Sequence, residues 1–198
     1  WPSPSAGGTA RYAPDLPRLS GGRTGIDITT SSHRERAPRS GPARLLYVGR
    51  LEYEKGVQDA IAALPRIRRF HPGTTLVVAG DGTQSEWLRE QARVHRVARS
   101  VTFLGNLDHT ELLDRLHTAD AIVLPSRYEP FGIIALEAAA AGTPLVTSTA
   151  GGLGEAVVDG TTGLSFPPGD VAALTSAVRK TLDDPAAAHL AQAHGTGR

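Results

Sequence analysis

Two glutamates eight positions apart are the side chains best placed to do chemistry in this sequence. Glu129 comes directly before Pro130, and Glu137 is the one charged residue in the otherwise apolar stretch 131–141. Proline presets the backbone for a helix start, so this stretch predicts a helix with Glu129 at its mouth. At 1.5 Å per residue, the two carboxylates would lie roughly 12 Å apart along the helix axis.

The helix that carries Glu137 is expected to be buried, because its sequence is apolar on every side. A carboxylate inside such a helix needs a partner. Glu137 is therefore either a ligand-binding acid, for which the two hydroxyls of a ribose are a suitable target, or a core carboxylate bridged to a neighbouring backbone. Glu129 could bind a ligand or complement the helix dipole. Gly132, expected in the first turn, would let an anion approach the free N–H groups there.

Two basic residues follow an earlier apolar stretch. Residues 45–48 predict a buried strand, and Arg50 and Lys55 lie in the polar loop after it. Two cations in such a loop suit a diphosphate, although on their own they would also fit solvated surface charges. Next to the helix start at Gly132 we favour diphosphate binding without a divalent ion, in agreement with the absence of an Asp-x-Asp pair.

A third loop, Gly105-Asn106-Leu107, also follows a predicted strand. Its backbone N–H and C=O groups could read the edge of a nucleobase, or the segment could be an ordinary loop. Other chemistries have little support. Gly80-Asp81-Gly82 begins a dinucleotide fingerprint, but Ser85 stands where its third glycine belongs. The sequence contains no Walker A, His-Glu-x-x-His or Gly-x-Ser-x-Gly motif.

Strand-like and helix-like segments alternate along the part of the chain that carries these residues. The strand-like segments are continuous apolar runs, which predicts a parallel sheet with helices on both faces, a Rossmann-like α/β fold. Ligands of such sheets bind at the carboxyl ends of the strands. Pro65 is expected to kink or shorten its helix. Asp108, with Glu111 three residues on, predicts a capping box at the start of its helix, and residues 149–154 predict a glycine-rich loop. The predicted strands are 45–48, 75–79, 101–104, 121–124, 144–147 and 163–166, and the predicted helices are 57–70, 84–97, 108–119, 131–141 and 170–182.

Composition limits the class of protein. The 198 residues are 40% hydrophobic and carry a net charge of +1, enough for one α/β domain and without a broad attraction to nucleic acid. No apolar run is long enough for a transmembrane segment. There is no Cys, so disulfides and thiolate sites are excluded. There is also no Met, and we interpret the chain as a fragment or a processed piece. Residues 1–43 predict a disordered or linker segment, 44–184 the Rossmann-like α/β domain, and 185–198 a frayed tail.

Taken together, these loops resemble the C-terminal, donor-binding domain of a GT-B glycosyltransferase, specifically the retaining family-4 type (glycosyl transferases group 1). The resemblance covers 44–184, and its most specific part is a complete Glu-x7-Glu motif from Glu129 to Glu137. The other matching motifs are Val48-Gly49-Arg50-Leu51 with Lys55-Gly56, Ala79-Gly80-Asp81-Gly82, Phe103-Leu104-Gly105, Ala141-Gly142-Thr143-Pro144, Gly151-Gly152 with Glu155, and Asp159-Gly160 with Gly163.

The resemblance implies a role for each matched residue. Arg50 and Lys55 would bind and stabilise the diphosphate leaving group, and Glu129 would contact hydroxyls of the donor sugar. Glu137 would bind the ribose. The backbone at Phe131, Gly132 and Ile133 would hold sugar and phosphate, and the backbone at Gly105, Asn106 and Leu107 would hold the base.

The implied activity is that of a retaining hexosyltransferase that needs no metal and no cofactor beyond its nucleotide-sugar donor. The acceptor is unknown, and the family's N-terminal domain, which binds it, is missing from this sequence. Residues 1–43 could be a remnant of that domain. The expected location is cytoplasmic, or peripheral at a membrane through the missing domain. Two alternatives stay open: a truncated nucleotide-sugar-binding module without activity of its own, and an NAD-dependent oxidoreductase.

Overall fold

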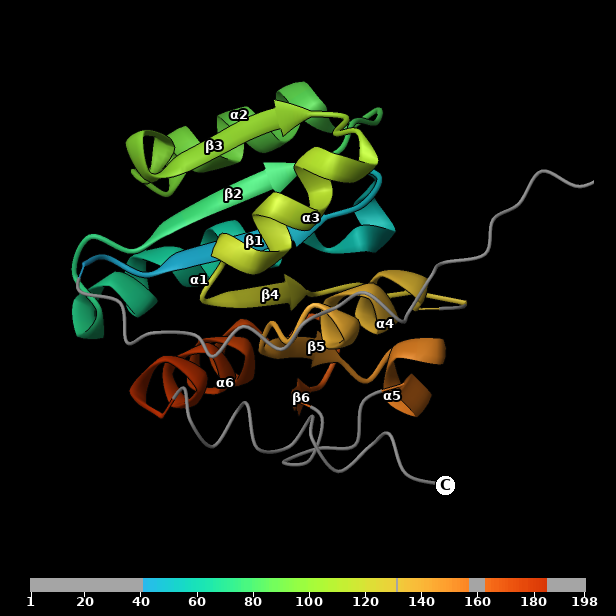
Figure 1. Ribbon diagram of the computed structural model, residues 1–198. Coiled ribbons are helices and arrows are strands. Elements are labelled where there is room, and N and C mark those ends of the chain that lie inside the picture. The colour runs from blue at the N-terminus through green and yellow to red at the C-terminus, as the bar shows by residue number, and fades with distance from the viewer. Residues whose placement is uncertain (1–40, 131, 157–162, 185–198) are drawn as a thin grey trace, which may run out of the picture. The chain divides into compact units, whose positions relative to one another are not determined.

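A six-stranded sheet forms the centre of the protein (Figure 1). The computed structural model describes residues 41–130, 132–156 and 163–184, all of which belong to one compact unit, Ser31–Arg198. Neighbouring strands pair in parallel, in the order β3-β2-β1-β4-β5-β6. The predicted fold class is therefore confirmed. The strands are β1 (Arg44–Val48), β2 (Thr75–Ala79), β3 (Val101–Gly105), β4 (Ala121–Leu124), β5 (Leu145–Ser148) and β6 (Leu164–Phe166).

Helices cover both faces of the sheet, because alternate side chains of each buried strand point to opposite sides. Leu45 and Tyr47 of β1 join the core under one set of helices, while Leu46 joins the core under the other. The first set consists of α1 (Val57–Phe70), α2 (Ser85–Val94) and α6 (Val171–Asp183). The second consists of α3 (His109–Thr118) and α4 (Ile133–Ala140), with Leu153 of α5 (Gly152–Ala156).

Several helix ends follow the sequence closely. The predicted capping box before α3 is present, since Asp108 accepts from the Glu111 backbone N–H and Glu111 accepts from that of Asp108. Pro65 does not shorten α1, which continues to Phe70. Two short 3-10 turns, η2 (Tyr53–Lys55) and η3 (Ala98–Ser100), were not predicted. The helix expected over 84–97 ends at Val94, and the glycine-rich loop expected over 149–154 runs into α5.

The prediction that α4 is buried on all sides is wrong. Ala135 and Ala138 pack into the core, but Ile133 and Leu136 are 59% and 60% exposed, and Glu137 is only half-buried. Only one side of α4 faces the sheet, and the chain described here does not cover the other. The Glu137 carboxylate therefore avoids the full desolvation that its apolar neighbours in the sequence suggested.

The strand order creates a switch point between β1 and β4. From β1 the chain moves to β2 and β3 on one side, and from β4 it moves to β5 and β6 on the other. The loops that follow β1 and β4 therefore diverge at the carboxyl edge and flank a crevice, the usual ligand position in an open parallel sheet. Arg50 and Lys55 lie in the first of these loops, and Glu129 lies in the second.

Arg96 ends α2 in a backbone conformation that favours glycine, with φ at 58°. The hydrogen bonds from Arg96 N–H to Arg93 C=O and from Val97 N–H to Ala92 C=O form a Schellman motif, in which glycine is the usual residue at this place. We expect Arg96→Gly to raise the free energy of unfolding by about 0.5–1 kcal/mol because it removes this strain. Urea denaturation measures the effect. Arg99→Gly, outside the motif, is the control and should bring no gain.

Candidate functional site

Backbone hydrogen bonds join the two loops at the switch point. The N–H groups of Arg127 and Tyr128 both donate to the carbonyl oxygen of Glu54, at 2.7 and 3.3 Å. The loops also touch at Gly56, where a Cβ would come within 1.9 Å of the Pro125 carbonyl oxygen. These contacts therefore bring Lys55, which follows Glu54, and Glu129, two positions beyond Arg127, to the same place.

Lys55 and Glu129 form an ion pair. Lys55 Nζ lies 2.8 Å from Glu129 Oε2, and the two side chains are 11% and 16% exposed. The other carboxylate oxygen, Oε1, accepts from the backbone N–H of Gly132 at 3.4 Å. A cation, a carboxylate and the amide before a helix thus meet in one mostly buried cluster, a combination that can hold an anion next to a hydroxyl-bearing group.

Glycines after β5 fix the main chain of Glu129. Gly152 N–H donates to the Glu129 carbonyl oxygen at 2.7 Å. At Gly151, with φ at 50°, a Cβ would lie 2.4 Å from the same oxygen. Only glycine permits this approach, which gives a physical reason for Gly151 in the sequence.

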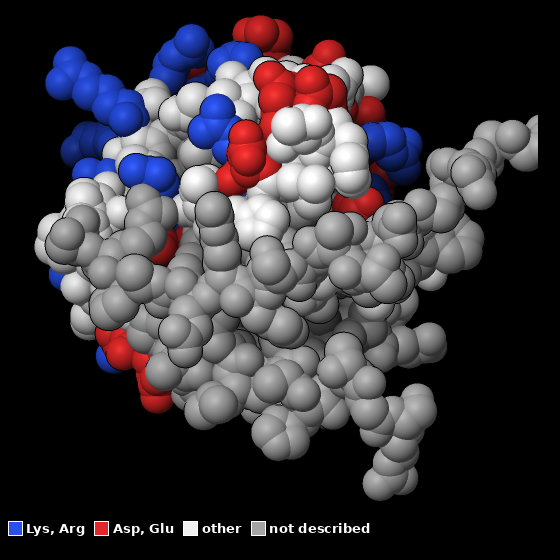
Figure 2. All heavy atoms as spheres, in the orientation of Figure 1, with Lys and Arg blue, Asp and Glu red and all other residues white. Residues whose placement is uncertain are grey.

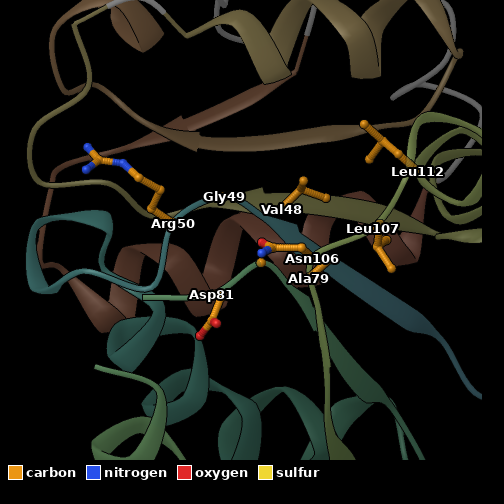
Figure 3. A pocket seen from close by; sticks show the side chains of 9 residues that line it. Val48, Gly49, Arg50, Ala79, Asp81, Asn106, Leu107 and Leu112 are labelled. Atoms are coloured by element: carbon orange, nitrogen blue, oxygen red, sulfur yellow. The ribbon is translucent and has the colours of Figure 1, made fainter. Parts of the chain in front are cut away.

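Arg50, Asn106 and Leu107 line a neighbouring hollow of about 180 Å³ at the carboxyl ends of β1, β2 and β3 (Figure 3). Figure 3 shows the Arg50 side chain reaching away from Asn106 and Leu107. Pockets that enclose a whole ligand usually measure about 300–1,000 Å³. The hollow therefore fits only part of a nucleotide sugar, and the rest of such a ligand would extend beyond it. The remaining lining residues are Val48, Gly49, Ala79, Gly80, Asp81 and Leu112.

Gly105 has one group already engaged. Its carbonyl oxygen accepts from Gly80 N–H at 2.7 Å, which leaves its second lone pair for a ligand. The predicted site residues thus fall into two adjacent groups: Lys55, Glu129 and Gly132 together, and Arg50 with Asn106 and Leu107. Of the remaining ones, Ile133 and Glu137 follow on α4, and Phe131 lies outside the described residues.

Tyr47, which the sequence analysis missed as a site residue, links the two groups. It is 1% exposed, and its hydroxyl donates to the Arg50 carbonyl oxygen at 2.8 Å. Burial raises the pKa of Tyr47 well above its ordinary value, and the nearby negative charge of Glu129 adds to the effect. A tyrosine inside an apolar strand reads as core in a sequence, so no signal there distinguished it.

We expect this buried phenol to make stability fall at high pH. The unfolded chain releases the Tyr47 proton near the ordinary pKa of 10.0, whereas the folded protein keeps it, so rising pH favours the unfolded chain. The loss should begin near pH 10 and approach about 1.4 kcal/mol per pH unit. Urea denaturation between pH 8 and 11 measures it. Tyr47→Phe should show a shallower decline, and equal slopes would contradict the assignment.

Charges of both signs occur on the described part of the face shown in Figure 2. This agrees with the net charge of +1 and indicates that anion attraction at the site must come from local cations. Within 41–130, 132–156 and 163–184, no three His, Asp or Glu side chains gather as a metal site would require. In the same residues, no helix combines the length and apolar character needed to cross a bilayer.

Comparison with known proteins agrees with this fold. A "Glycogen synthase" from Mycobacterium tuberculosis is 66% identical over 180 residues, which cover 91% of this chain and 44% of that protein. Sucrose-phosphate synthase from Thermosynechococcus elongatus superposes with a TM-score of 0.69 at 37% identity, over 76% of this chain and 39% of that one. Anabaena HepE in complex with UDP-glucose gives a TM-score of 0.68 at 28% identity, over 76% and 42%.

The strand order, the two-sided helix layers and the crevice at the switch point define a Rossmann-like domain of the kind that forms the C-terminal half of a GT-B fold. The chain belongs to the family described as glycosyl transferases group 1, whose match covers residues 29–196. It spans less than half the length of the relatives just described. The family assignment speaks against the oxidoreductase alternative.

Proposed function

We propose that this chain is the donor-binding domain of a retaining, metal-independent glycosyltransferase that moves a sugar from a nucleoside diphosphate to an acceptor. The observation that carries the proposal is the cluster of Lys55, Glu129 and the Gly132 amide at the switch point. The similarity to HepE, whose structure holds UDP-glucose, supports a nucleotide-sugar donor for this chain as well.

In this proposal the diphosphate lies between the start of α4 and the cations of Arg50 and Lys55, which neutralise it as it leaves. Glu129 accepts from hydroxyls of the sugar, and the amides of Gly132 and Ile133 hold sugar and phosphate, together with that of Phe131. Glu137 binds the ribose from the next turns of α4. Two side-chain cations meet the charge of the leaving group, so the proposal needs no divalent ion.

The reaction breaks the bond between the anomeric carbon and the diphosphate oxygen and forms a bond from that carbon to the acceptor oxygen on the same face. The leaving phosphate takes the acceptor's proton, so catalysis depends on positioning and charge stabilisation. The acceptor would be bound by a second domain, outside this sequence. We expect the 198 residues alone to bind nucleotide weakly and to transfer sugar poorly or not at all.

Calorimetry with UDP, GDP, ADP and NAD tests the proposed function. One nucleoside diphosphate should bind and NAD should not, and a preference for NAD would overturn the proposal. Glu137→Ala should weaken the binding of that nucleotide by about 1–3 kcal/mol, the range for a lost hydrogen bond in a protected site. Glu90→Ala, which removes an exposed glutamate of α2 that pairs with Arg93, is the matched control and should leave affinity unchanged. Unaltered affinity in Glu137→Ala would make Glu137 a structural residue.

A further inference from the structure

A second ion pair lies directly behind the proposed donor site. Arg127 Nη2 donates to Asp59 Oδ1 at 2.9 Å and to Oδ2 at 3.0 Å. The Asp59 side chain is 8% exposed and that of Arg127 is 36% exposed. Asp59 belongs to the first turn of α1, and Arg127 belongs to the loop after β4. The pair therefore connects the two elements that flank the switch point.

The backbone of Arg127 reinforces this connection, since its N–H donates to the Glu54 carbonyl oxygen at 2.7 Å. Lys55 is the residue after Glu54, and Glu129 is two residues after Arg127. The hydrogen bond therefore lies close to both along the chain. The Arg127 guanidinium also lies 5.2 Å from the centre of the Tyr53 ring. It is thus held from several sides, unlike a freely moving surface cation.

We propose that Asp59 and Arg127 are positioning residues that fix Glu129 relative to Lys55, and thereby set the preference of the site for a nucleotide sugar over the bare nucleoside diphosphate. This inference rests on the proposed function. There, Lys55 faces the diphosphate, which both ligands share, and Glu129 faces the sugar, which only one has. Moving Glu129 away from its place would spoil the sugar contact and leave most of the diphosphate contact intact. Neither Asp59 nor Arg127 touches the ligand.

The test compares two affinities in each variant by calorimetry. The probes are UDP with UDP-glucose, ADP with ADP-glucose, and GDP with GDP-mannose, and the pair that the wild type binds best is used. In Asp59→Asn and Arg127→Gln, the ratio of nucleotide-sugar affinity to nucleoside-diphosphate affinity should fall at least tenfold, while the diphosphate affinity changes less than threefold. The double variant Asp59→Glu with Arg127→Lys restores an ion pair and should recover most of the ratio.

A residue that only stabilises the fold would behave differently. Both affinities would then stay unchanged or fall in the same proportion. The ratio of the two affinities would stay constant, and this result would overturn the inference. Arg179→Gln is the matched control, because it removes the exposed Arg179–Asp183 pair, which lies at the far end of α6. It should leave both affinities as they are.

Hydrogen exchange separates a failure of this inference from a failure of the proposed function. In Asp59→Asn, amides of the loops 49–56 and 125–130 should exchange at least tenfold faster, while those of β2 and β3 keep their rates. A wild type that binds none of the probes would overturn the proposed function, and exchange would then decide alone whether the pair holds the loops. Equal acceleration throughout the sheet would show a general stabilising role and end the inference.

Discussion

Glu129→Gln should bind the bare nucleoside diphosphate about threefold to tenfold more tightly than the wild type, by about 0.7–1.4 kcal/mol. Lys55 Nζ is paired with Glu129 Oε2 at 2.8 Å, and in the proposed mode the same ammonium group must turn to the diphosphate. Glutamine removes both this competition and a negative charge beside the incoming anion. The gain is modest because the amide oxygen of the glutamine can still accept a hydrogen bond from Lys55. Calorimetry with UDP, GDP and ADP measures it.

The same substitution should lower sugar transfer by the full-length parent protein about 100-fold or more, because the amide is a weaker acceptor for the sugar hydroxyls. Tighter nucleotide binding with slower transfer is a combination that simple misfolding cannot produce. Glu52→Gln is the control, since Glu52 lies in the same loop but accepts from Thr83 at 2.5 and 3.1 Å. If Glu52→Gln gives the same gain in affinity, the gain comes from the lower negative charge of the loop. The proposed competition between Glu129 and the diphosphate for Lys55 would then be wrong.

Gly56→Ala should lower the free energy of unfolding by about 3–5 kcal/mol. The added Cβ would lie 1.9 Å from the Pro125 carbonyl oxygen. This oxygen belongs to the main chain of the other loop, so the clash can be relieved only if the two loops move apart. The positive φ of 71° adds about 1–2 kcal/mol of strain. Because Gly56 adjoins Lys55, nucleotide affinity should fall as well. Urea denaturation and calorimetry measure the two effects.

Gly105→Ala provides a closely matched control. Its φ of 74° is nearly that of Gly56, but a Cβ there would meet no atom within 4 Å. The free energy of unfolding of Gly105→Ala should fall only by the backbone strain, about 1–2 kcal/mol. The difference between the two variants therefore isolates the contact between the loops. Equal losses would show that the loops can separate at little cost, contrary to their hydrogen bonds.

Local patterns in the sequence were sufficient to predict the fold class and most elements. Continuous apolar runs predicted β2 and β4 residue by residue, and the acidic residues Asp108 and Glu111 predicted their capping box. These features depend on near neighbours and on the period of burial, which a single chain displays openly. The same reasoning failed for α4, because an apolar helix is buried only where something packs on it, and the described part of the chain covers one side.

Local patterns were enough to place Arg50, Lys55 and Glu129 in loops after strands, and hence at one edge of a parallel sheet. Which of them meet follows from the three-dimensional arrangement: Lys55 joins Glu129, whereas Arg50 lines the neighbouring hollow. It also assigned a place at the site to Tyr47, Asp59 and Arg127. Their contacts join residues of different strand ends or depend on the strand order, and no local period of the sequence records distances across a sheet.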